Sequence, residues 1–376
     1  MLKGCVLSRL SSLEAGVLGD FGTDAGADGP ASVPFTQCLC PDEAKGQCCC
    51  FKTSSWFDRS AGNPADPMKV FLKDEPYSDK KCSENRFRVL FVMSLVDQVI
   101  DRLLFTPMTG VEVRSPMDGV SKAGWSPFPM GYHRLVAEFP YSESLAVDKT
   151  AWDWTMPGWV VRAYFDLKLS QCINSTTRYQ HLARMRAHYV VGPGARIVLP
   201  NGDSYRQRSW GLMKSGWLLT ISMNSAAQYF QHCLAWQRSG MPGGVPAMWA
   251  MGDDSLVRIH NTIPVTSYLE ELARTGCLVK HGLRRREFSG YLFEESSVEP
   301  LYPERHKMSL RFCSPDIEQD FLTSMQLMYA LSNNRWIDGW LHRARMDIRV
   351  AAACWANGLL RLSVLDNIPT DWSRWF

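Results

Sequence analysis

Apolar and polar residues recur along this chain with two different periods, and the change of period marks the predicted elements. Short apolar runs bounded by turn residues predict strands at residues 89–92, 145–148, 197–205, 249–257 and 287–293. Apolar positions three and four residues apart predict helices at 94–104, 159–192 and 267–276, over a stretch ending near 236, and over most of the chain after 314. Residues 106–140 predict a loop-rich connection. Together these elements indicate an α+β fold.

Three predicted helices carry sequence signals at their ends. Ser94 opens a capping-box pattern. Ser267 is expected to cap a helix that stops near Gly276, and Ser314, which is followed by proline, is expected to start the next one. The first of these helices is expected to bury one face, made by Leu95, Val96, Val99, Ile100, Leu103 and Leu104.

Composition places the chain among globular proteins. With 376 residues, 45% of them hydrophobic and 21% charged, it is long enough for a large core or for about two or three subdomains. The formal net charge of +3 is too small to indicate a polyanionic partner by itself. The sequence contains neither a signal-peptide pattern nor an uninterrupted apolar run of about 18 residues, so a cytosolic location is expected.

The N-terminal part, residues 1–60, mixes Gly, Ser, Ala and Cys without sustained periodicity and predicts an extension that is partly ordered at most. Five of the 12 cysteines cluster there, at Cys38, Cys40, Cys48, Cys49 and Cys50. A zinc site is one interpretation, but three consecutive cysteines cannot easily face one ion. Free thiols in a reducing compartment are the favoured interpretation.

Two adjacent carboxylates, Asp253 and Asp254, lie at the bend of a predicted hairpin. They repel each other unless a cation lies between them, and carboxylate oxygens are the ligands that Mg²⁺ prefers. Asp148 ends a predicted strand and is the candidate third ligand, and Asp153 follows five residues later. The structural alternatives are a hairpin tip that faces solvent and a helix N-cap at Asp148.

A basic stretch precedes the first predicted helix. Lys73, Lys80, Lys81, Arg86 and Arg88 are interspersed with strand-like apolar residues. Such a ribbon can clamp phosphates, because lysine and arginine donors are the usual binders of polyanions. A solvated charged hairpin is the alternative.

Two further polar patterns remain. Thr220, Asn224 and Gln228 recur every four residues and share one helix face. These side chains are expected to form hydrogen bonds either with other groups in the core or with a ribose hydroxyl and the backbone of a template. Near the C-terminal end, Arg335, Arg343, Arg345 and Arg349 lie among Trp336, Trp340 and Trp355. This pattern favours a solvated basic face over a core, with RNA contact as the alternative.

The order of these features is more informative than any one of them. A basic ribbon, D-x₄-D after a strand, S-G-x₃-T-x₃-N-S at a helix start, G-D-D in a hairpin, a lysine after a helix and a strand-turn element follow one another. This order resembles the right-hand fold of positive-strand viral RNA-dependent RNA polymerases. The similarity covers roughly residues 68–293 and is strongest to the sobemovirus, polerovirus and barnavirus branch in Lys73-Asp74-Glu75-Pro76, Ser94-Leu95-Val96-Asp97-Gln98 and Asp148-Lys149-Thr150-Ala151-Trp152-Asp153-Trp154.

The resemblance implies a two-metal catalytic centre. Asp148 matches the first aspartate of motif A and Asp253 the first of motif C. Both are therefore expected to hold two Mg²⁺ ions, for which Mn²⁺ can substitute, with Asp254 assisting. One ion lowers the pKa of the primer 3′-hydroxyl, and the other steadies the triphosphate and the leaving pyrophosphate. Lys280 matches the motif D lysine that is expected to protonate pyrophosphate, with His281 as the alternative.

The other motif residues are implied to bind nucleotide, template or primer. Asp153 and Asn224 match the pair that senses the ribose 2′-hydroxyl. Ser215, Gly216 and Thr220 match the motif B loop and helix start, which hold the template and the nascent base pair. The motif F side chains that line the nucleotide entry channel are Lys73, Lys81, Arg86 and Arg88. The motif E primer grip consists of Phe288, Ser289, Gly290 and Tyr291.

By resemblance the α+β fold has the right-hand architecture, in which the palm carries an antiparallel sheet and the thumb is small and helical. The expected fingers are residues 61–140 and 170–212, the palm residues 141–169 and 213–293, and the thumb residues 294–376. The extension at residues 1–60 is able to contribute to the fingers.

The implied function is template-directed nucleotidyl transfer by an RNA-directed RNA polymerase that replicates a viral RNA genome. Its partners would be template and product RNA, ribonucleoside triphosphates and a genome-linked protein primer, with unprimed initiation as the alternative. The expected location is the host cytoplasm, with recruitment to membrane-associated replication complexes by other proteins. The alternatives are a catalytically inactive RNA-binding relative, which the complete aspartate set disfavours, and a reverse transcriptase, which the pair Asp153 and Asn224 disfavours.

Overall fold

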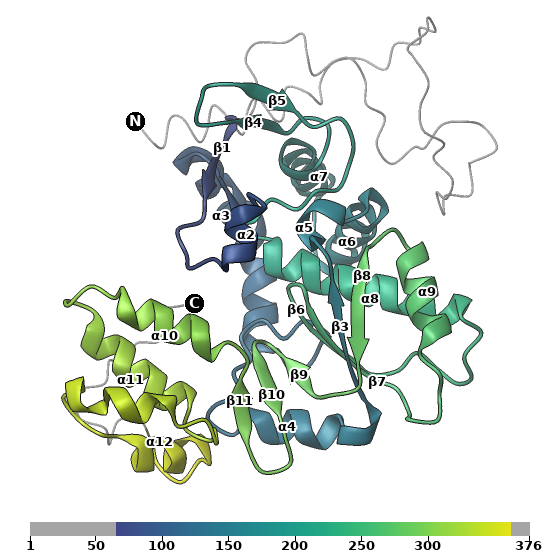
Figure 1. Cartoon of the computed structure of the whole chain (residues 1–376). Helices are drawn as coiled ribbons and strands as arrows, with labels where there is room; N and C mark the ends of the chain where they lie inside the picture. The colour runs from purple at the N-terminus through teal and green to yellow at the C-terminus, as the bar shows by residue number, and fades with distance from the viewer. Residues whose placement is uncertain (1–64, 362–376) are drawn as a thin grey trace, which may run out of the picture. The chain divides into compact units, whose positions relative to one another are not determined.

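The computed structural model describes residues 65–361, which are coloured in Figure 1. The predicted extension at residues 1–60 and the cysteine cluster lie outside this range. The described chain divides into two compact units: the first comprises residues 65–71, Val89–Met108 and Pro157–Leu219, and the second comprises Leu72–Arg88, Thr109–Met156 and residues 220–361. Both units contain helices and antiparallel strands, which confirms the α+β class. Within residues 65–361, every helix is too short or too polar to cross a lipid bilayer.

The first unit combines helices with a small mixed sheet. Its helices are α3 (Leu95–Arg114), whose last residues belong to the second unit, α6 (Gly158–Gln171) and α7 (Thr177–Val191). The sheet has the order β2-β1-β4-β5 and consists of β1 (Met68–Leu72), β2 (Val89–Val92), β4 (Arg196–Val198) and β5 (Ser204–Arg206). β4 and β5 form the hairpin predicted at residues 197–205, and Gly202 in its turn has a φ of 91°. The helical prediction for residues 159–192 is confirmed as two helices.

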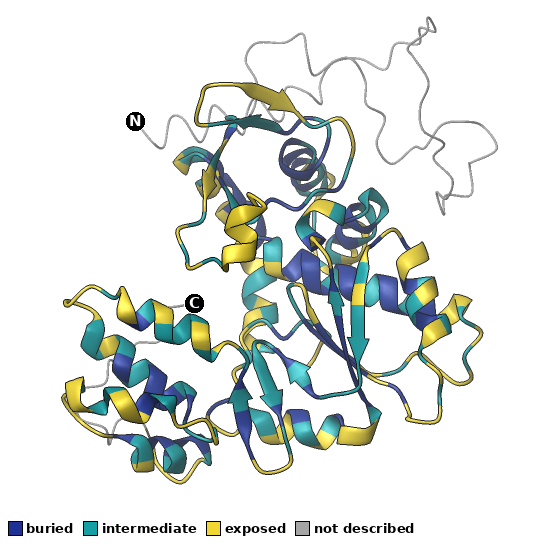
Figure 2. Cartoon of the chain, viewed as in Figure 1, coloured by how far each residue is buried: buried dark blue, intermediate teal, exposed yellow. Residues whose placement is uncertain are grey.

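The second unit is built on an antiparallel sheet with the order β6-β7-β3-β8 (Figure 1). Its strands are β3 (Ser144–Lys149), β6 (Met248–Met251), β7 (Asp254–Arg258) and β8 (Val279–Leu283). One face is covered by α8 (Thr220–Arg238) and α9 (Thr266–Arg274), and α8 is largely buried (Figure 2). On the other face Trp249 and Leu256 pack with Leu135 of α4 (Gly131–Glu138). Burial on both faces explains why these strands are short continuous apolar runs.

The remaining elements are a second sheet, the C-terminal helices and three short helices. β9 (Glu287–Phe288), β10 (Tyr291–Phe293) and β11 (Val298–Pro300) form a second antiparallel sheet. The C-terminal part is mostly helical, as predicted, with α10 (Pro303–Arg311), α11 (Glu318–Met328), the 3₁₀ helix η4 (Trp336–Arg343) and α12 (Arg349–Ala356). The short helices are α2 (Asp79–Ser83), η3 (Tyr141–Glu143) and α5 (Trp152–Thr155).

Helix α3 buries only part of the predicted face. Ile100 and Leu104 are buried as predicted, whereas Leu95 and Leu103 are 63% and 60% exposed. The prediction was therefore wrong for Leu95 and Leu103.

Two carboxylates of α3, Asp97 and Asp101, are buried instead. Arg186 of α7 pairs with both carboxylates, with Nε 2.6 Å from Asp101 Oδ1 and Nη1 3.1 Å from Asp97 Oδ1. Apolar spacing cannot detect carboxylates that a distant arginine neutralises.

Two of the three predicted helix starts are displaced. The backbone N–H of Asp97 donates a 3.2 Å hydrogen bond to Ser94 Oγ, as expected for a cap. Helix α9 begins one residue before Ser267 and has no side-chain cap. Helix α11 begins beyond Ser314, and the proline that opens a helix is Pro303 of α10. A serine followed by proline also suits a turn, so this signal does not specify a helix by itself.

The stretch at residues 106–140, predicted to be loop-rich, is partly helical. Helix α3 continues through Pro107 to Arg114, and α4 follows at Gly131–Glu138. A proline inside a helix removes one backbone donor, and the neighbouring turns can still hold the helix together. The prediction was wrong because it treated proline and glycine as ends of regular structure.

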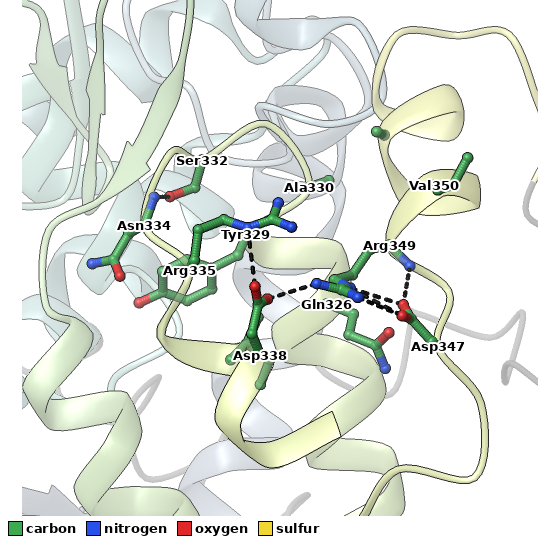
Figure 3. A pocket seen from close by; sticks show the side chains of 12 residues that line it. Gln326, Tyr329, Ala330, Ser332, Asn334, Arg335, Asp338, Asp347, Arg349 and Val350 are labelled. Atoms are coloured by element: carbon green, nitrogen blue, oxygen red, sulfur yellow. Dashed lines mark hydrogen bonds and ion pairs between the residues drawn. The ribbon is translucent and has the colours of Figure 1, made fainter. Parts of the chain in front are cut away.

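A cavity of about 400 Å³ lies among the C-terminal helices (Figure 3). Arg335 and Arg349 line it, and each donates to a carboxylate oxygen of Asp338. Arg349 also donates to Asp347. These arginines are paired with neighbouring carboxylates, which agrees better with a structural basic face than with an RNA contact.

Candidate active site

The Gly252-Asp253 bend joins β6 to β7 as predicted. Met251 pairs with Asp254 across the hairpin, which leaves Gly252 and Asp253 as a two-residue loop. Gly252 has a φ of 65°, in the left-handed region that glycine adopts without strain. The first loop position of a tight hairpin often requires such a φ, so glycine is needed where the sequence places it.

Strand β3 brings Asp148 beside this hairpin. Val147 pairs with Ser255 of β7, and Ser255 Oγ donates a 3.0 Å hydrogen bond to the Val147 carbonyl. The next residue of β3, Asp148, therefore lies beside Asp254, on a strand about 4.8 Å away. Asp148 is thus brought close to two adjacent carboxylates, Asp253 and Asp254, that are distant from it in sequence.

These carboxylates perturb one another electrostatically. Both aspartates of the hairpin keep exposed surface, yet partial burial raises the pKa of Asp254 to about 7, with further contributions from Asp253, Asp148 and Glu287. Partial burial also raises the pKa of Asp253, and Asp153 and Asp148 add to this rise. A divalent cation would relieve the repulsion, and acceptor-only oxygens suit a hard ion. The donor set therefore fits a metal site.

The ammonium of Lys280 lies where a cation is expected. Lys280 of β8 has its Nζ 2.6 Å from Asp148 Oδ2, and His281 Nε2 lies 3.6 Å from the same oxygen. The hydrogen bond to Asp148 raises the pKa of Lys280. With the side chains in these positions, no group of three His, Cys, Asp or Glu residues in the described range could hold a metal ion. Oδ2 of Asp148 therefore has a protein cation as its partner in this arrangement.

Helix α8 holds the hairpin bend by two hydrogen bonds. The backbone N–H of Gly252 donates to Ser225 Oγ at 3.0 Å, and Nε2 of Gln228 donates to the Asp253 carbonyl at 3.1 Å. For Gln228, the predicted polar ridge therefore resolves into core hydrogen bonds. Lys149, which the sequence did not single out, is buried against Gln228, and burial lowers the pKa of Lys149 to about 8.

Asp153 and Asn224 form the pair that the motifs predicted. Nδ2 of Asn224 donates a 3.2 Å hydrogen bond to Oδ1 of Asp153. Asn224 is 3% exposed, and its Oδ1 has no hydrogen-bond partner within residues 65–361. Since Asp153 also raises the pKa of Asp253, the pair lies near the carboxylates.

The basic ribbon divides into two parts. Lys73 Nζ lies 3.0 Å from Glu75 Oε2, and Arg88 Nη1 lies 3.5 Å from Glu75 Oε1. Arg88 also counteracts the raised pKa of Asp253, which indicates that it faces the hairpin bend. Arg86 pairs instead with Glu84, and Lys81 lies on the exposed helix α2. Of the four basic residues matched to motif F, Lys73 and Arg88 contact the same carboxylate, that of Glu75.

Two residues near the start of α10 escaped the sequence-based prediction. Arg305 Nη2 lies 2.5 Å from Glu75 Oε2, so a third cation shares that carboxylate. Partial burial raises the pKa of Tyr302, and Asp254, Glu287 and Asp148 add to the rise, which indicates that its phenol faces the carboxylates. The one local signal was the proline after Tyr302, which predicts a helix start but no partner.

The strand-turn element contributes a backbone donor to the carboxylates. Ser289 and Gly290 both have positive φ, 51° and 77°, as in the tight turns that favour hairpins. The backbone of Ser289 donates a hydrogen bond to the carboxylate of Asp254. Phe288 is 1% exposed and packs against Trp249 in the core, so it holds the adjacent turn against the core.

Gly216 occupies a position that only glycine can fill. Its φ is 112°, and a Cβ atom there would lie 2.5 Å from the carbonyl oxygen of Phe91. The backbone N–H of Phe91 donates a 3.0 Å hydrogen bond to the carbonyl of Ser215, so the two segments lie in close contact within the first unit. Thr220, the last residue of this motif, begins α8 in the second unit.

Comparison with known proteins identifies a similar family. The model of a family described as viral RNA-directed RNA-polymerase matches residues 184–283, a range that contains Asn224, the Gly252–Asp254 bend and Lys280. The predicted resemblance is confirmed. The chain is similar to positive-strand viral RNA-directed RNA polymerases of the sobemovirus, polerovirus and barnavirus branch.

Individual relatives of this polymerase family match most of the chain. The replicase polyprotein P2AB of Cocksfoot mottle virus is 28% identical over 256 residues, which cover 66% of this chain and 24% of the relative. Protein P1-P2 of Potato leafroll virus is 26% identical over 308 residues, which cover 74% of this chain and 27% of the relative. The RNA-directed RNA polymerase of Mushroom bacilliform virus is 29% identical over 242 residues, which cover 61% of this chain and 56% of the relative. The chain thus spans about a quarter of the two polyprotein-sized relatives.

Proposed function

We propose that this chain is an RNA-directed RNA polymerase that copies a viral RNA genome, with fingers, palm and thumb arranged as a right hand. The observation that carries the proposal is the placement of Asp148 beside Asp254 and next to the Asp253 bend. Their number and chemistry suit phosphoryl transfer, which depends on positioning and charge stabilisation and needs no protein nucleophile. The family match supports the same assignment.

Divalent metal ions are the general cofactors of this family, and we propose two Mg²⁺ ions, for which Mn²⁺ can substitute. Asp148 and Asp253 would hold them, with Asp254 assisting, and when bound they lower the pKa of the attacking hydroxyl and stabilise the triphosphate charge. Oδ2 of Asp148 becomes available to a metal when its ion pair with Lys280 opens. The released ammonium is then available to donate a proton to pyrophosphate.

The nucleotide would be selected by Asn224 and Asp153. A carboxylate only accepts hydrogen bonds, so Asp153 holds the NH₂ group of Asn224 and turns Oδ1 toward the site. This oxygen is an acceptor for the ribose 2′-hydroxyl, which distinguishes RNA precursors from DNA precursors. Lys73 and Arg88 supply cations for the triphosphate, and Lys81 and Arg86 would extend the entry channel.

The remaining contacts would be with RNA. Ser215, Gly216 and Thr220 would support the template and the nascent pair, and the turn at Ser289 and Gly290, anchored by Phe288 and Tyr291, would support the primer. The partners are template and product RNA, ribonucleoside triphosphates and a genome-linked protein primer, with unprimed initiation as the alternative. The place of action would be the host cytoplasm, at membrane-associated complexes assembled by other proteins.

Replacing one carboxylate tests the proposal. Asp253→Asn preserves the size of the side chain and removes the charge that would hold a metal, so we expect incorporation of a nucleotide on a primed RNA template in Mg²⁺ to be abolished. Thermal unfolding of the variant checks that the fold is intact. Incorporation at the wild-type rate by Asp253→Asn would exclude this residue from the catalytic centre.

A further inference from the structure

Lys149, the residue directly after Asp148, has its side chain in the core. It is 6% exposed, and its Nζ donates to Oε1 of Gln228 and, at 2.6 Å, to Oε1 of Gln231. The same Nζ lies 4.5 Å from the centre of the Trp152 ring. The pairing of β3 with β8 shifts register between Asp148 and Lys149. Such a shift re-aims neighbouring side chains, so a carboxylate for the site and a cation for the core can be adjacent in sequence.

The ammonium fixes which way the Gln228 amide faces. An ammonium has only donors, so it holds the carbonyl oxygen of Gln228 and leaves the NH₂ group on the opposite side. That NH₂ group donates the 3.1 Å hydrogen bond to the Asp253 carbonyl. A flipped amide would lose both hydrogen bonds and bring like groups together, which is costly in a buried site.

The orientation of this carbonyl matters for the carboxylates. The peptide unit that follows Asp253 is planar, so fixing its carbonyl also fixes the backbone nitrogen of Asp254 and the plane that contains the Cα atoms of both aspartates, which restricts where their side chains can lie. The other attachment of the bend, from Gly252 to Ser225, does not involve the ammonium. Loss of the ammonium would therefore loosen one of the two hydrogen bonds from α8.

From this geometry we propose that Lys149 is a positioning residue for the catalytic aspartates, acting through the amide of Gln228 on the Asp253 peptide. The inference rests on the proposed polymerase activity and adds to it a buried cation that does not touch substrate. In this route the ammonium of Lys149 orients the Gln228 amide, and that amide orients the bend at Asp253.

Single-nucleotide incorporation by the full chain, on a primed RNA template in Mg²⁺, tests this route. Lys149→Met keeps the length of the side chain and removes the donor. We expect kcat to fall about 10- to 100-fold, as for small misplacements of catalytic groups, with the nucleotide KM changed less than about threefold. A role confined to core stability would lower the unfolding temperature and leave kcat of the folded enzyme unchanged.

Gln228→Met and Gln231→Met form a matched pair. Each removes one carbonyl partner of the ammonium, but only Gln228 donates to the Asp253 bend, whereas Nε2 of Gln231 has no hydrogen-bond partner among residues 65–361. We expect Gln228→Met to lower kcat about as much as Lys149→Met does, and Gln231→Met to change it less than about threefold. The double variant Lys149→Met/Gln228→Met is expected to lose no more than the more impaired single variant, because the two residues act in one chain.

Three results would overturn the inference: a wild-type kcat in Lys149→Met, multiplicative losses in the double variant, or equal losses in the matched pair. If Lys149→Met does not fold, Lys149→Gln replaces it, since an amide is not restricted to donating and no longer fixes Gln228; the same loss in kcat is expected. Asp253→Asn in the same assay separates the two proposals. An inactive Asp253→Asn with an unimpaired Lys149→Met would refute only the positioning role.

Discussion

At the level of single residues, two side-chain amides on one face of α8 differ in which of their hydrogen-bonding groups have partners. Gln228 has both ends of its amide engaged, by Lys149 and by the Asp253 carbonyl. Asn224, one turn earlier, has its NH₂ group held by Asp153 and its carbonyl oxygen buried without a partner in the described chain. A buried acceptor that lacks a donor is costly, so this oxygen is suited to the proposed contact with a ribose hydroxyl.

Asn224→Ala removes this acceptor. We expect the preference for a ribonucleotide over the matching deoxyribonucleotide to fall about 10- to 100-fold, the usual worth of a buried hydrogen bond to a charged or strongly oriented group. The ratio of kcat/KM for paired CTP and dCTP incorporation measures it. Gln228→Met serves as the control, because it is expected to slow both substrates alike. An unchanged ratio in Asn224→Ala would argue against sugar selection by this pair.

His232 in α8 is buried in its neutral form. Its Nε2 lies 3.0 Å from the Pro246 carbonyl, which only accepts, so Nε2 carries the proton and Nδ1 accepts from the Tyr268 hydroxyl at 2.8 Å. Burial lowers the pKa of His232 to about 4. Between pH 4 and 6.5 the unfolded chain therefore binds more protons at this site, and the stabilisation is lost as the pH falls through that range.

His232→Gln isolates this effect from the other groups that titrate in acid. We expect the difference in unfolding free energy between wild type and His232→Gln to be largest at pH 7 and to shrink as the pH is lowered toward 4. Urea unfolding at a series of pH values measures both proteins. A difference that is independent of pH would mean that His232 is not kept neutral by its surroundings.

At the scale of elements, one carboxylate joins the basic ribbon to the C-terminal helices. Glu75 receives Lys73 and Arg88 from the ribbon and Arg305 from α10. Three cations share one anion, so the cluster keeps an excess of positive charge near the carboxylates of the candidate site. This excess is suited to a nucleotide triphosphate, and α10 supplies part of it.

Arg305→Gln removes the contribution of α10. Because the side chain of Arg305 is 40% exposed, the effect is expected to be modest, a rise of about two- to fivefold in the nucleotide KM with kcat nearly unchanged. Steady-state incorporation measures both constants. Arg311→Gln, an exposed arginine on the same helix, is the control for a general loss of charge. Equal KM values for the two variants would assign no special role to Arg305.

At the scale of the whole molecule, the elements that sequence predicts well are those with a local cause. The Gly252 and Gly202 hairpins are confirmed because a positive φ and flanking apolar runs are encoded within a few residues. The exposure of Leu95 and Leu103 and the continuation of α3 through Pro107 were not predicted, because both depend on packing against distant segments. Local patterns report backbone preferences, and tertiary partners override them.

The same division applies to the candidate site. Asp148 and Asp254 are brought together from distant parts of the chain, and only the order of the motifs suggested that they meet. Lys149, Arg305 and Tyr302 were missed, since a lysine after a strand or an arginine on a helix has no local mark of its partner. Each of these three residues interacts with groups that are distant in sequence, and neither composition nor motif spacing reveals such contacts.

The buried cluster of Arg186, Asp97 and Asp101 in the first unit restricts how the sequence can drift. Losing Arg186 leaves two buried carboxylates without their cation, at a cost of about 3–5 kcal/mol, whereas exchanging all three for apolar side chains of similar volume is often neutral. Replacement that begins at Arg186 therefore passes through an intermediate that folds poorly. Sequences that descend from this chain are expected to keep Arg186 for as long as both carboxylates remain.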